Sequence, residues 1–360
     1  NLVNELLQLG LLKEVGSVTQ PIGRSRVLLS LNEDSVQVIG IEIKRNGIFG
    51  LLTDLNGVVR TVSAQDFESG APSYRVLGGL YAVTEELMAA ASGGKGELLG
   101  IGIGTPGPVD VQEGMVFEPP NFPGLHNMAL KRIMEERYGV PCVLNDDART
   151  SALGEAWFGA GQGVASLVFI SMGEGIGSGI ILDHRLYDGV HDIAGQIGHF
   201  TVEPKGKLCD CGNIGCLETV ASIPAIAERA RHVGYNEPNG LSDTAMLAKL
   251  VEAYRVGSPG ASQIFDETLD YVVAAVISAI NAYDPEMVIL GGRLIQLCPE
   301  MVDIVRRRVK ARCFYHIADD LRITSTRLGP QTSALGAVTL LLQRLLSEPI
   351  AILEAIQESR

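Results

Sequence analysis

The chain has 360 residues, of which 46% are hydrophobic, and a formal net charge of −13 at pH 7. This length and hydrophobic content allow a large buried core and predict two or three domains, while the acidic balance disfavours a nucleic-acid-binding surface over the whole molecule. A small basic module would be hidden in that total. We expect a cytoplasmic protein without membrane contact, because no apolar run approaches the roughly eighteen to twenty residues that span a bilayer and the start does not resemble a signal peptide.

The first residues predict a helix followed by a hairpin. The segment NLVNELLQLGLLKE (1–14) repeats leucine and valine at intervals of three and four residues, which is typical of a helix. A polar, turn-rich segment follows at 16–23, and residues 24–31 alternate enough to form a strand or one arm of a hairpin. A helix and then a hairpin is typical of the end of a winged helix. Because the chain opens inside a helix at Asn1, we expect further residues upstream.

A new domain is expected near residue 33, where strand patterns begin. Residues 36–43 and 47–65 predict the strands of a hairpin, with one turn at Asp54, Asn56 and Gly57. Predicted helices at 73–91 and 128–138 then alternate with predicted strands at 98–104 and 140–144. This alternation favours an α/β lobe around a central sheet.

A second lobe is expected from about residue 151. The segments SLVFISM (166–172) and GSGIILD (177–183) predict two strands joined through glycines, and a long helix at 265–283 leads to the strand MVILGG (287–292). The strand-turn-strand openings of the two lobes could be distant copies of one unit. Two such lobes would enclose a cleft.

The segment HFTVEPKGKLCDCGNIGCLE (199–218) predicts a structural zinc site. It holds three of the six cysteines and a histidine, namely His199, Cys209, Cys211 and Cys216. One imidazole and three thiolates form a closed tetrahedral ligand set for Zn²⁺, which leaves no position for substrate or water. The alternative is three reduced thiols in a turn, but the spacing and the added histidine favour zinc. The other cysteines have no paired spacing and suggest buried thiols in a reducing compartment; they are Cys142, Cys298 and Cys313.

With these motifs the sequence resembles the ROK family, which comprises bacterial repressors, uncharacterised open reading frames and sugar kinases. The resemblance covers nearly the whole chain. It depends on the cysteine loop and on GIGTPGPVD (102–110), PNFPG (120–124), NDDARTSALGEAWFGAG (145–161), GEGIGSGI (173–180), AGQIGH (194–199) and ILGG (289–292). It implies a two-lobe α/β fold of the actin-like and hexokinase-like ATPases, with ribonuclease H-like lobes.

The resemblance also implies a division into domains. Residues 1–32 would be the C-terminal remnant of a winged helix-turn-helix, with residues 2–14 as the recognition helix and its tail and residues 22–26 as the wing. Residues 33–151 plus 336–360 would form the smaller lobe, and residues 152–335 the larger lobe with the zinc loop and a dimerisation surface. The family's kinases lack the first piece, and the alternative is that residues 1–32 are an amphipathic appendage. The candidate DNA contacts are Asn1, Asn4, Arg24 and Arg26.

The resemblance places Asp147 at the position of the family's catalytic base, which in a repressor would accept a hydrogen bond from a sugar. Asp146 then occupies the preceding amide position, although an Asp-Asp pair can also be a helix N-cap. Gln196 stands where the family's sugar kinases usually carry Glu, and a metal-bound His199 would keep its second ring nitrogen for the ligand. The full set of candidate sugar ligands is Asn121, Asp146, Asp147, Gln196, His199 and Glu218.

Kinase activity depends on a phosphate-binding turn. The family's kinases share an Asp-x-Gly-Gly-Thr turn after the first strand, whereas this chain has Glu42-Ile-Lys-Arg-Asn, which removes the glycines that allow the backbone to approach a phosphate. We therefore predict a sugar-responsive repressor that binds operator DNA and a small carbohydrate effector as a homodimer or homotetramer.

Two alternatives stay open. One is a sugar sensor without DNA binding. The other is an ATP-dependent hexose or N-acylhexosamine kinase that uses Mg²⁺, with Asp147 as base. Its nucleotide site would be formed by Gly173, Gly175, Gly177, Gly291 and Gly292.

Overall fold

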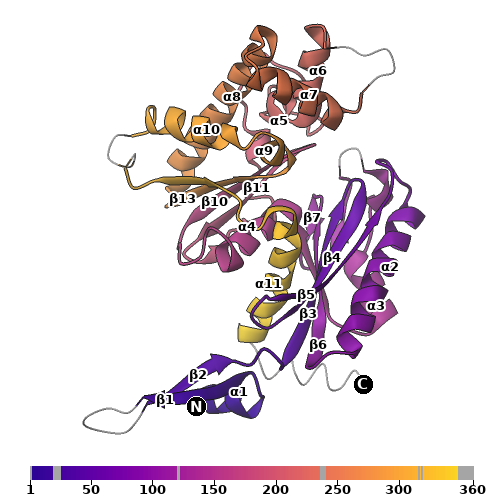
Figure 1. Ribbon diagram of the computed structural model, residues 1–360. Helices are drawn as coiled ribbons and strands as arrows, with labels where there is room; N and C mark the ends of the chain where they lie inside the picture. Colours follow the sequence, from indigo (N-terminus) through magenta and orange to yellow (C-terminus); the bar gives the residue numbers. More distant parts are fainter. Residues whose placement is uncertain are drawn as a thin grey trace. The chain divides into compact units, whose positions relative to one another are not determined.

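The computed structural model describes residues 2–18, 26–119, 122–235, 241–314, 317 and 319–347. The chain divides into two compact units, which we call unit 1 (Asn1–Thr150 with Ala334–Arg360) and unit 2 (Ser151–Ser333). Each unit contains a mixed five-stranded sheet with helices packed on it (Figure 1). The two-lobe α/β fold predicted from the sequence is confirmed.

The N-terminal segment consists of helix α1 (Leu2–Gln8) and an antiparallel hairpin of β1 (Leu12–Val18) and β2 (Arg26–Leu31). The prediction of a helix as far as residue 14 is wrong, because Gly10 at φ +70° ends the helix and the next residues enter β1. The turn expected from residue 16 is also displaced, since β1 continues to Val18. The order of one helix followed by a hairpin agrees with the sequence analysis.

The sheet of unit 1 has the strand order β5-β4-β3-β6-β9. Strands β3, β4 and β5 form an antiparallel meander, whereas β6 and β9 run parallel to β3. Asp54 Oδ1 accepts hydrogen bonds from the amides of Asn56 (2.9 Å) and Val58 (3.1 Å), and Gly57 has φ +75°, so the predicted turn is present. The strands are β3 (Val36–Lys44), β4 (Gly47–Asp54), β5 (Val59–Asp66), β6 (Glu97–Thr105) and β9 (Cys142–Asp146), with a small pair formed by β7 (Val109–Asp110) and β8 (Met115–Val116).

Two helices cover opposite faces of this sheet (Figure 1). Gly50 of β4 faces α2 (Ser73–Ser92), because a Cβ there would meet Val83 and Leu87. Gly40 and Gly102 are paired across β3 and β6, and a Cβ on either would overlap a backbone carbonyl oxygen of α11 (Thr332–Ser347). These two glycines therefore let the α11 backbone lie directly on the sheet. Helix α3 (Leu130–Tyr138) and the 3₁₀ turn η1 (Pro123–Leu125) complete the connections.

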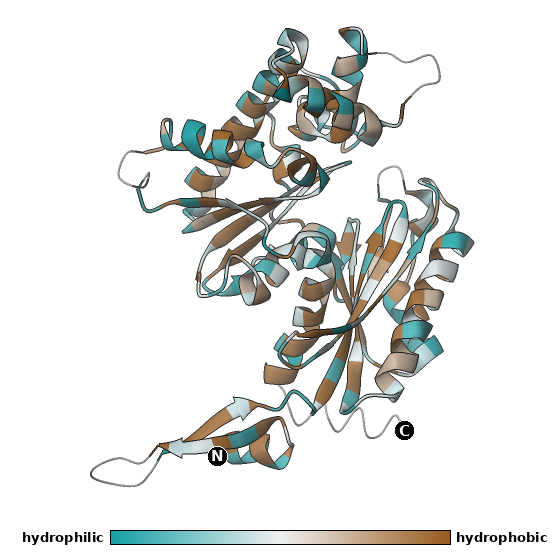
Figure 2. Cartoon of the chain, in the orientation of Figure 1, coloured by the Kyte–Doolittle hydropathy of each residue, from teal (hydrophilic) through white to brown (hydrophobic). Residues whose placement is uncertain are grey.

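The sheet of unit 2 has the order β12-β11-β10-β13-β14, with β10, β11 and β12 antiparallel and β13 and β14 parallel to β10. Its strands are β10 (Leu167–Met172), β11 (Ile176–Leu182), β12 (Arg185–Leu186), β13 (Met287–Gly291) and β14 (Arg322–Ser325). Figure 2 shows the apolar residues concentrated along the central strands of both sheets. The helices are α5 (Glu218–Ala221), α6 (Ile223–His232), α7 (Asp243–Arg255), α8 (Pro259–Tyr283), α9 (Arg293–Leu297) and α10 (Glu300–Lys310), with 3₁₀ turns η2 (Ile197–His199) and η3 (Gly329–Gln331).

Both sheets follow one plan, in which a central strand has a meander on one side and two parallel strands on the other. This agrees with the expectation that the two lobes are copies of one unit. In each unit the last strand leads to a helix that continues into the other unit's part of the chain. After β9 this helix is α4 (Asp147–Phe158), and after β14 it is α11.

Candidate metal and sugar sites

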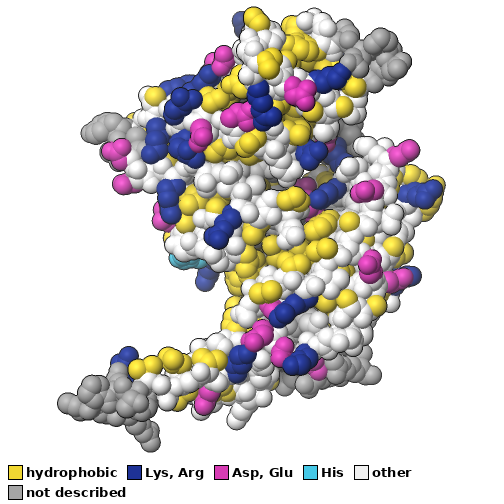
Figure 3. Space-filling view, in the orientation of Figure 1, with side chains coloured by type: hydrophobic (Ala, Val, Ile, Leu, Met, Phe, Trp, Pro, Cys, Tyr) yellow, Lys and Arg dark blue, Asp and Glu magenta, His cyan; other side chains and the backbone are white. Residues whose placement is uncertain are grey.

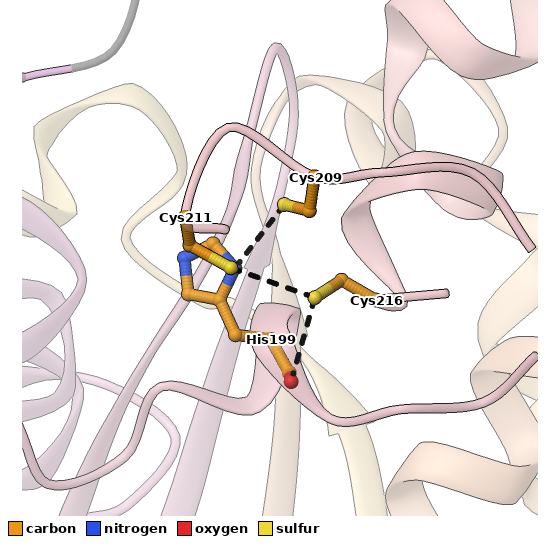
Figure 4. A group of neighbouring side chains, drawn as sticks. All are labelled: His199, Cys209, Cys211 and Cys216. Atoms are coloured by element: carbon orange, nitrogen blue, oxygen red, sulfur yellow. Dashed lines mark hydrogen bonds between the residues drawn. The ribbon is translucent and has the colours of Figure 1, made fainter. Parts of the chain in front are cut away.

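Four side chains of unit 2 form a compact cluster that could hold a metal ion. His199, Cys209, Cys211 and Cys216 each place one ligand atom within 4.8 Å of the others. The Sγ of Cys209 is 3.6 Å from Nδ1 of His199, and the Sγ atoms of Cys211 and Cys216 are 3.7 Å apart (Figure 4). A tetrahedral zinc ion with bonds of about 2.3 Å to sulfur separates two of its sulfur ligands by about 3.8 Å. The distances therefore fit a single ion at the centre of the predicted ligand set.

The backbone of the cysteine loop accounts for this arrangement. The Cys209 amide donates to the carbonyl of Asn213 at 2.8 Å, and the Gly212 amide donates to the carbonyl of Cys209 at 2.9 Å, which closes a tight turn around Cys211. Gly212 and Gly215 have φ values of +88° and +72°, which other residues rarely adopt. The loop conformation thus places the sulfur atoms together through main-chain hydrogen bonds.

The chemistry of the cluster also fits a cation. Burial raises the pKa of the Cys209 thiol to about 12, so this side chain would stay protonated at neutral pH unless a positive charge stabilised the thiolate. A bound metal ion supplies that charge and deprotonates its thiol ligands. Four protein ligands complete a tetrahedron, so the site is suited to holding the loop in shape and not to activating water.

A second group of polar side chains lies in unit 1, where the parallel strands end. Glu42 of β3 is paired with Gly104 of β6, which in turn is paired with Asn145 of β9. Asp146 ends β9, and Asp147 begins α4 directly after it. The carboxyl ends of parallel strands are the usual place for ligands in open α/β sheets. We call Glu42, Lys44, Arg45, Asp146 and Asp147 the polar cluster.

The two neighbouring aspartates have different surroundings. Asp146 Oδ1 accepts a hydrogen bond from the Ala148 amide at 3.0 Å, which makes Asp146 the N-cap of α4. Burial raises the pKa of Asp146, whereas the buried Arg149 favours the ionised form of this carboxyl group. Asp147 is the first residue of the helix. The N-cap alternative for the Asp-Asp pair therefore applies to Asp146.

Asp147 is half-buried and has the strongly perturbed acidity expected of a functional carboxyl group. Its pKa is raised to about 8 by burial and by the negative charges of Asp146 and Glu42, while Arg45 acts in the opposite direction. Near neutral pH both the acid and the carboxylate are thus accessible. The side chain can donate a hydrogen bond to a hydroxyl or accept one from it.

The turn after β3 differs from a phosphate-binding loop. Lys44 pairs with Gly47 across the hairpin, so only Arg45 and Asn46 connect the two strands, and neither has a positive φ. The Nζ of Lys44 lies 3.2 Å from a carboxylate oxygen of Glu42 and 5.2 Å from the ring centroid of Phe49. This turn offers no glycine cradle for phosphate, as the sequence predicts.

The predicted nucleotide-binding glycines lie at the ends of two neighbouring strands of unit 2. Gly173 and Gly175 form the turn between β10 and β11, and the Gly173 amide donates to the Gly175 carbonyl at 2.9 Å. Gly177 lies within β11, Gly291 ends β13, and Gly292 at φ +86° lies against Met172 of β10. The structure brings Gly173 and Gly292 together. The need for a tight connection between β10 and β11 would explain the glycines of this turn equally well without a nucleotide.

Of the remaining sugar candidates, the structure brings His199 and Glu218 close together, because the Leu217 amide donates to the Phe200 carbonyl at 2.9 Å. Glu218, at the start of α5, accepts a hydrogen bond from the Ile176 amide at 2.7 Å through Oε2. Gln196 is half-buried and directly precedes η2, and the Nδ1 of His199 faces the thiols. Asn121 lies outside the described residues. Sugar binding by these side chains stays a prediction.

The candidate DNA contacts lie on exposed parts of the N-terminal segment. Asn4 on α1 and Arg26 at the start of β2 are both exposed, whereas Asn1 and Arg24 lie outside the described residues. The hairpin also exposes apolar side chains such as Val15, Val27 and Leu28. Figure 3 shows a row of hydrophobic side chains along this segment. The candidate DNA contacts that the structure describes are thus accessible to solvent.

Sequence reasoning missed the role of one buried carboxylate. Glu155 of α4 is fully buried, and its Oε1 accepts hydrogen bonds from the Thr326 hydroxyl and from the amides of Arg327 and Leu328. Its Oε2 accepts the Ala160 amide at 2.7 Å. The residue belongs to the motif used to place Asp147, but the distant partners after β14 leave no local signal.

The fold and the two clusters define a two-lobe, hexokinase-like α/β protein that carries a candidate metal loop of three cysteines and one histidine. The model of the ROK family matches residues 38–344, and the chain belongs to this family. Among the described residues no helix has both the length and the apolar character needed to cross a membrane.

Three comparisons illustrate the range of the family. The xylose repressor of Caldicellulosiruptor bescii is 29% identical over 359 residues, which cover 97% of this chain and 89% of the relative. The glucokinase of Thermotoga maritima is 34% identical over 253 residues, or 68% of this chain and 80% of the relative. A solved ROK family transcriptional regulator, a homologue of the Escherichia coli MLC protein, has a TM-score of 0.81 and 28% identity over 99% of this chain and 90% of its own.

Proposed function

We propose that the protein is a sugar-responsive transcriptional repressor that binds operator DNA and is regulated by a small carbohydrate. The main support is the N-terminal helix and hairpin joined to a ROK fold, because the xylose repressor matches 97% of the chain and the glucokinase 68%. A repressor of this kind acts in the cytoplasm. Two recognition helices must reach successive turns of DNA, so we infer a homodimer or a homotetramer.

DNA binding would use the exposed surface of the N-terminal segment. Helix α1 would be the end of a recognition helix with Asn4 on its exposed side, and the β1–β2 hairpin would be the wing that carries Arg26. Arginine and asparagine suit phosphate and base-edge contacts. The acidic net charge of the whole chain is compatible with this role, since the contacts come from one small segment.

Sugar binding would depend on Asp147. This carboxyl group is half-buried at the carboxyl edge of a parallel sheet, and its pKa of about 8 suits exchange of hydrogen bonds with a hydroxyl. A sugar can shift the protein between DNA-bound and free forms only as far as it prefers one of them. Asp147 is therefore the side chain whose loss we expect to uncouple DNA binding from sugar.

We infer that the cluster of His199 and the three cysteines holds zinc in a structural role. Thiolates and imidazole are ligands that zinc prefers, and four of them leave no site for catalysis. A zinc ion would fix the cysteine loop between η2, which Gln196 directly precedes, and α5, which begins at Glu218. Metal binding would thus support the geometry of both candidate sugar ligands.

The alternative is a sugar kinase, which the identity to a glucokinase and the raised pKa of Asp147 both favour, because a general base works best near the operating pH. The turn at Arg45–Asn46 argues against it, since phosphoryl transfer needs ordered phosphates and magnesium.

Isothermal titration with xylose, glucose and N-acetylglucosamine, with and without ATP and Mg²⁺, separates the two functions. Sugar binding without nucleotide binding or phosphorylated product supports the repressor. Sugar-dependent consumption of ATP would establish the kinase.

A further inference from the structure

The polar cluster of unit 1 also indicates the charge of the ligand. Proteins bind phosphate through uncompensated cations, through the amides of a helix N-terminus or through turns whose backbone amides point inward. Each of these three devices has a counterpart in the polar cluster. The helix N-terminus and the cations already contact carboxylates of this protein. The backbone of the turn lacks the conformation that binds an anion.

The helix N-terminus is engaged by Asp146. Its Oδ1 accepts the Ala148 amide at 3.0 Å, and the Arg149 amide also hydrogen-bonds this carboxylate. The positive end of the α4 dipole is therefore satisfied by a side-chain anion. A ligand phosphate would have to displace Asp146 to use these amides.

The cations of the cluster face carboxylates. Lys44 Nζ is 3.2 Å from Glu42, and the positive charge of Arg45 acts on Asp147. The connecting turn has two residues without positive φ, so its amides do not form an anion-binding concavity. Neither the side chains nor the backbone of this turn supply a ready phosphate site.

The surroundings of Asp147 disfavour negative charge. Burial and the carboxylates of Asp146 and Glu42 outweigh Arg45 in raising the pKa of Asp147. A phosphate dianion in the same place would lose solvation and face the same carboxylates. A neutral hydroxyl meets neither penalty.

We propose that the effector bound at Asp147 is a neutral sugar and that the polar cluster discriminates against phosphorylated sugars. The inference rests on the sugar-binding function proposed above and adds the class of ligand. The discrimination comes from the carboxylates of Glu42, Asp146 and Asp147 together. They already interact with the groups at this edge of the sheet that could otherwise bind an anion.

Isothermal titration of the full-length protein tests the inference with xylose and xylose 5-phosphate, and with glucose and glucose 6-phosphate. We expect the neutral sugar that binds to do so at least about tenfold more tightly than its phosphate ester, because an unfavourable charge pair near a protein surface costs more than the roughly fivefold loss that it causes in bulk water. An ester that binds as tightly as its parent would overturn the inference but leave sugar regulation standing. Failure of these four compounds and of N-acetylglucosamine to bind would remove both.

A charge variant makes the same test specific to the polar cluster. Glu42→Gln removes one carboxylate and releases Lys44, so the ratio of ester affinity to parent affinity should rise about tenfold. The matched control is Asp34→Asn, which removes the same charge from an exposed ion pair with Lys95 in the same unit and should leave the ratio unchanged. An unchanged ratio in Glu42→Gln, or an equal rise in the control, would contradict the assignment.

Discussion

Replacement of Glu155 by alanine should destabilise unit 2 strongly, because this buried carboxylate accepts four hydrogen bonds. The substitution leaves the Thr326 hydroxyl and three backbone amides without their acceptor. An unsatisfied buried donor costs about 1–3 kcal/mol. Arg327 is exposed, so its amide can regain a water molecule. We therefore expect a total loss of about 3–5 kcal/mol, short of the sum of four separate penalties.

Glutamine at the same position is the informative control. Three of the four donors bind Oε1, which the amide oxygen of Glu155→Gln can replace, and only the Ala160 amide would face the new NH₂ group. We expect the glutamine variant to lose about 1–2 kcal/mol. The difference between the two variants separates the loss of the hydrogen-bond acceptor and of the side-chain volume from the loss of the negative charge.

The single tryptophan makes the measurement local. Trp157 lies two residues from Glu155 in α4, so its fluorescence during urea denaturation reports on this part of unit 2. Far-ultraviolet circular dichroism follows both units, which need not unfold together. A loss below about 1 kcal/mol for alanine, or equal losses for alanine and glutamine, would refute the hydrogen-bond explanation.

Three further predictions concern the metal loop, the α11 contact and the acidity of the polar cluster. Cys211→Ser should lower the zinc content, measured by elemental analysis, and the melting temperature. The control Cys313→Ser lies outside the metal cluster and should retain bound zinc. Full zinc occupancy in Cys211→Ser would reject the site. Gly102→Ala should destabilise unit 1 by about 3 kcal/mol or more in urea denaturation, because the new methyl group overlaps the backbone of α11. The control Gly78→Ala, at an open position in α2, should stabilise unit 1 by about 0.5–1 kcal/mol. Equal effects of the two substitutions would contradict the contact between Gly102 and α11. The pKa of Asp147 rises from 3.8 to about 8 on folding, so the folded state binds more protons between these values and stability should fall as pH rises through that window. Asp147→Asn should flatten this dependence, and an identical slope in both proteins would be evidence against the raised pKa.

The metal cluster could be predicted because its signal is local. Cys209, Cys211 and Cys216 lie close in sequence, and the glycines among them allow the turn that the structure shows. The central strands could also be predicted, since β3 is rich in valine and isoleucine and β10 is an almost continuously apolar run. In both cases the determining interactions lie within a few residues or follow from burial of one segment.

The features that sequence analysis missed depend on distant partners or on backbone geometry. The partners of Glu155 lie beyond β14, and no periodic pattern links them to α4. Asp146 caps α4 because the helix begins at the next residue. An Asp-Asp pair alone does not show at which of the two residues the helix begins. The early end of α1 at Gln8 depends on the positive φ of Gly10, which the leucine periodicity conceals.

The most direct test of regulation by sugar is operator binding by the full-length protein. A duplex selected from random DNA by the protein would be labelled and followed by fluorescence anisotropy, at fixed salt, during titration with xylose or another sugar that binds in calorimetry. The proposed function predicts tight, specific binding that the sugar weakens in the native protein and does not weaken in Asp147→Ala. Specific binding that no sugar alters, or failure to select any DNA sequence, would contradict a sugar-responsive repressor.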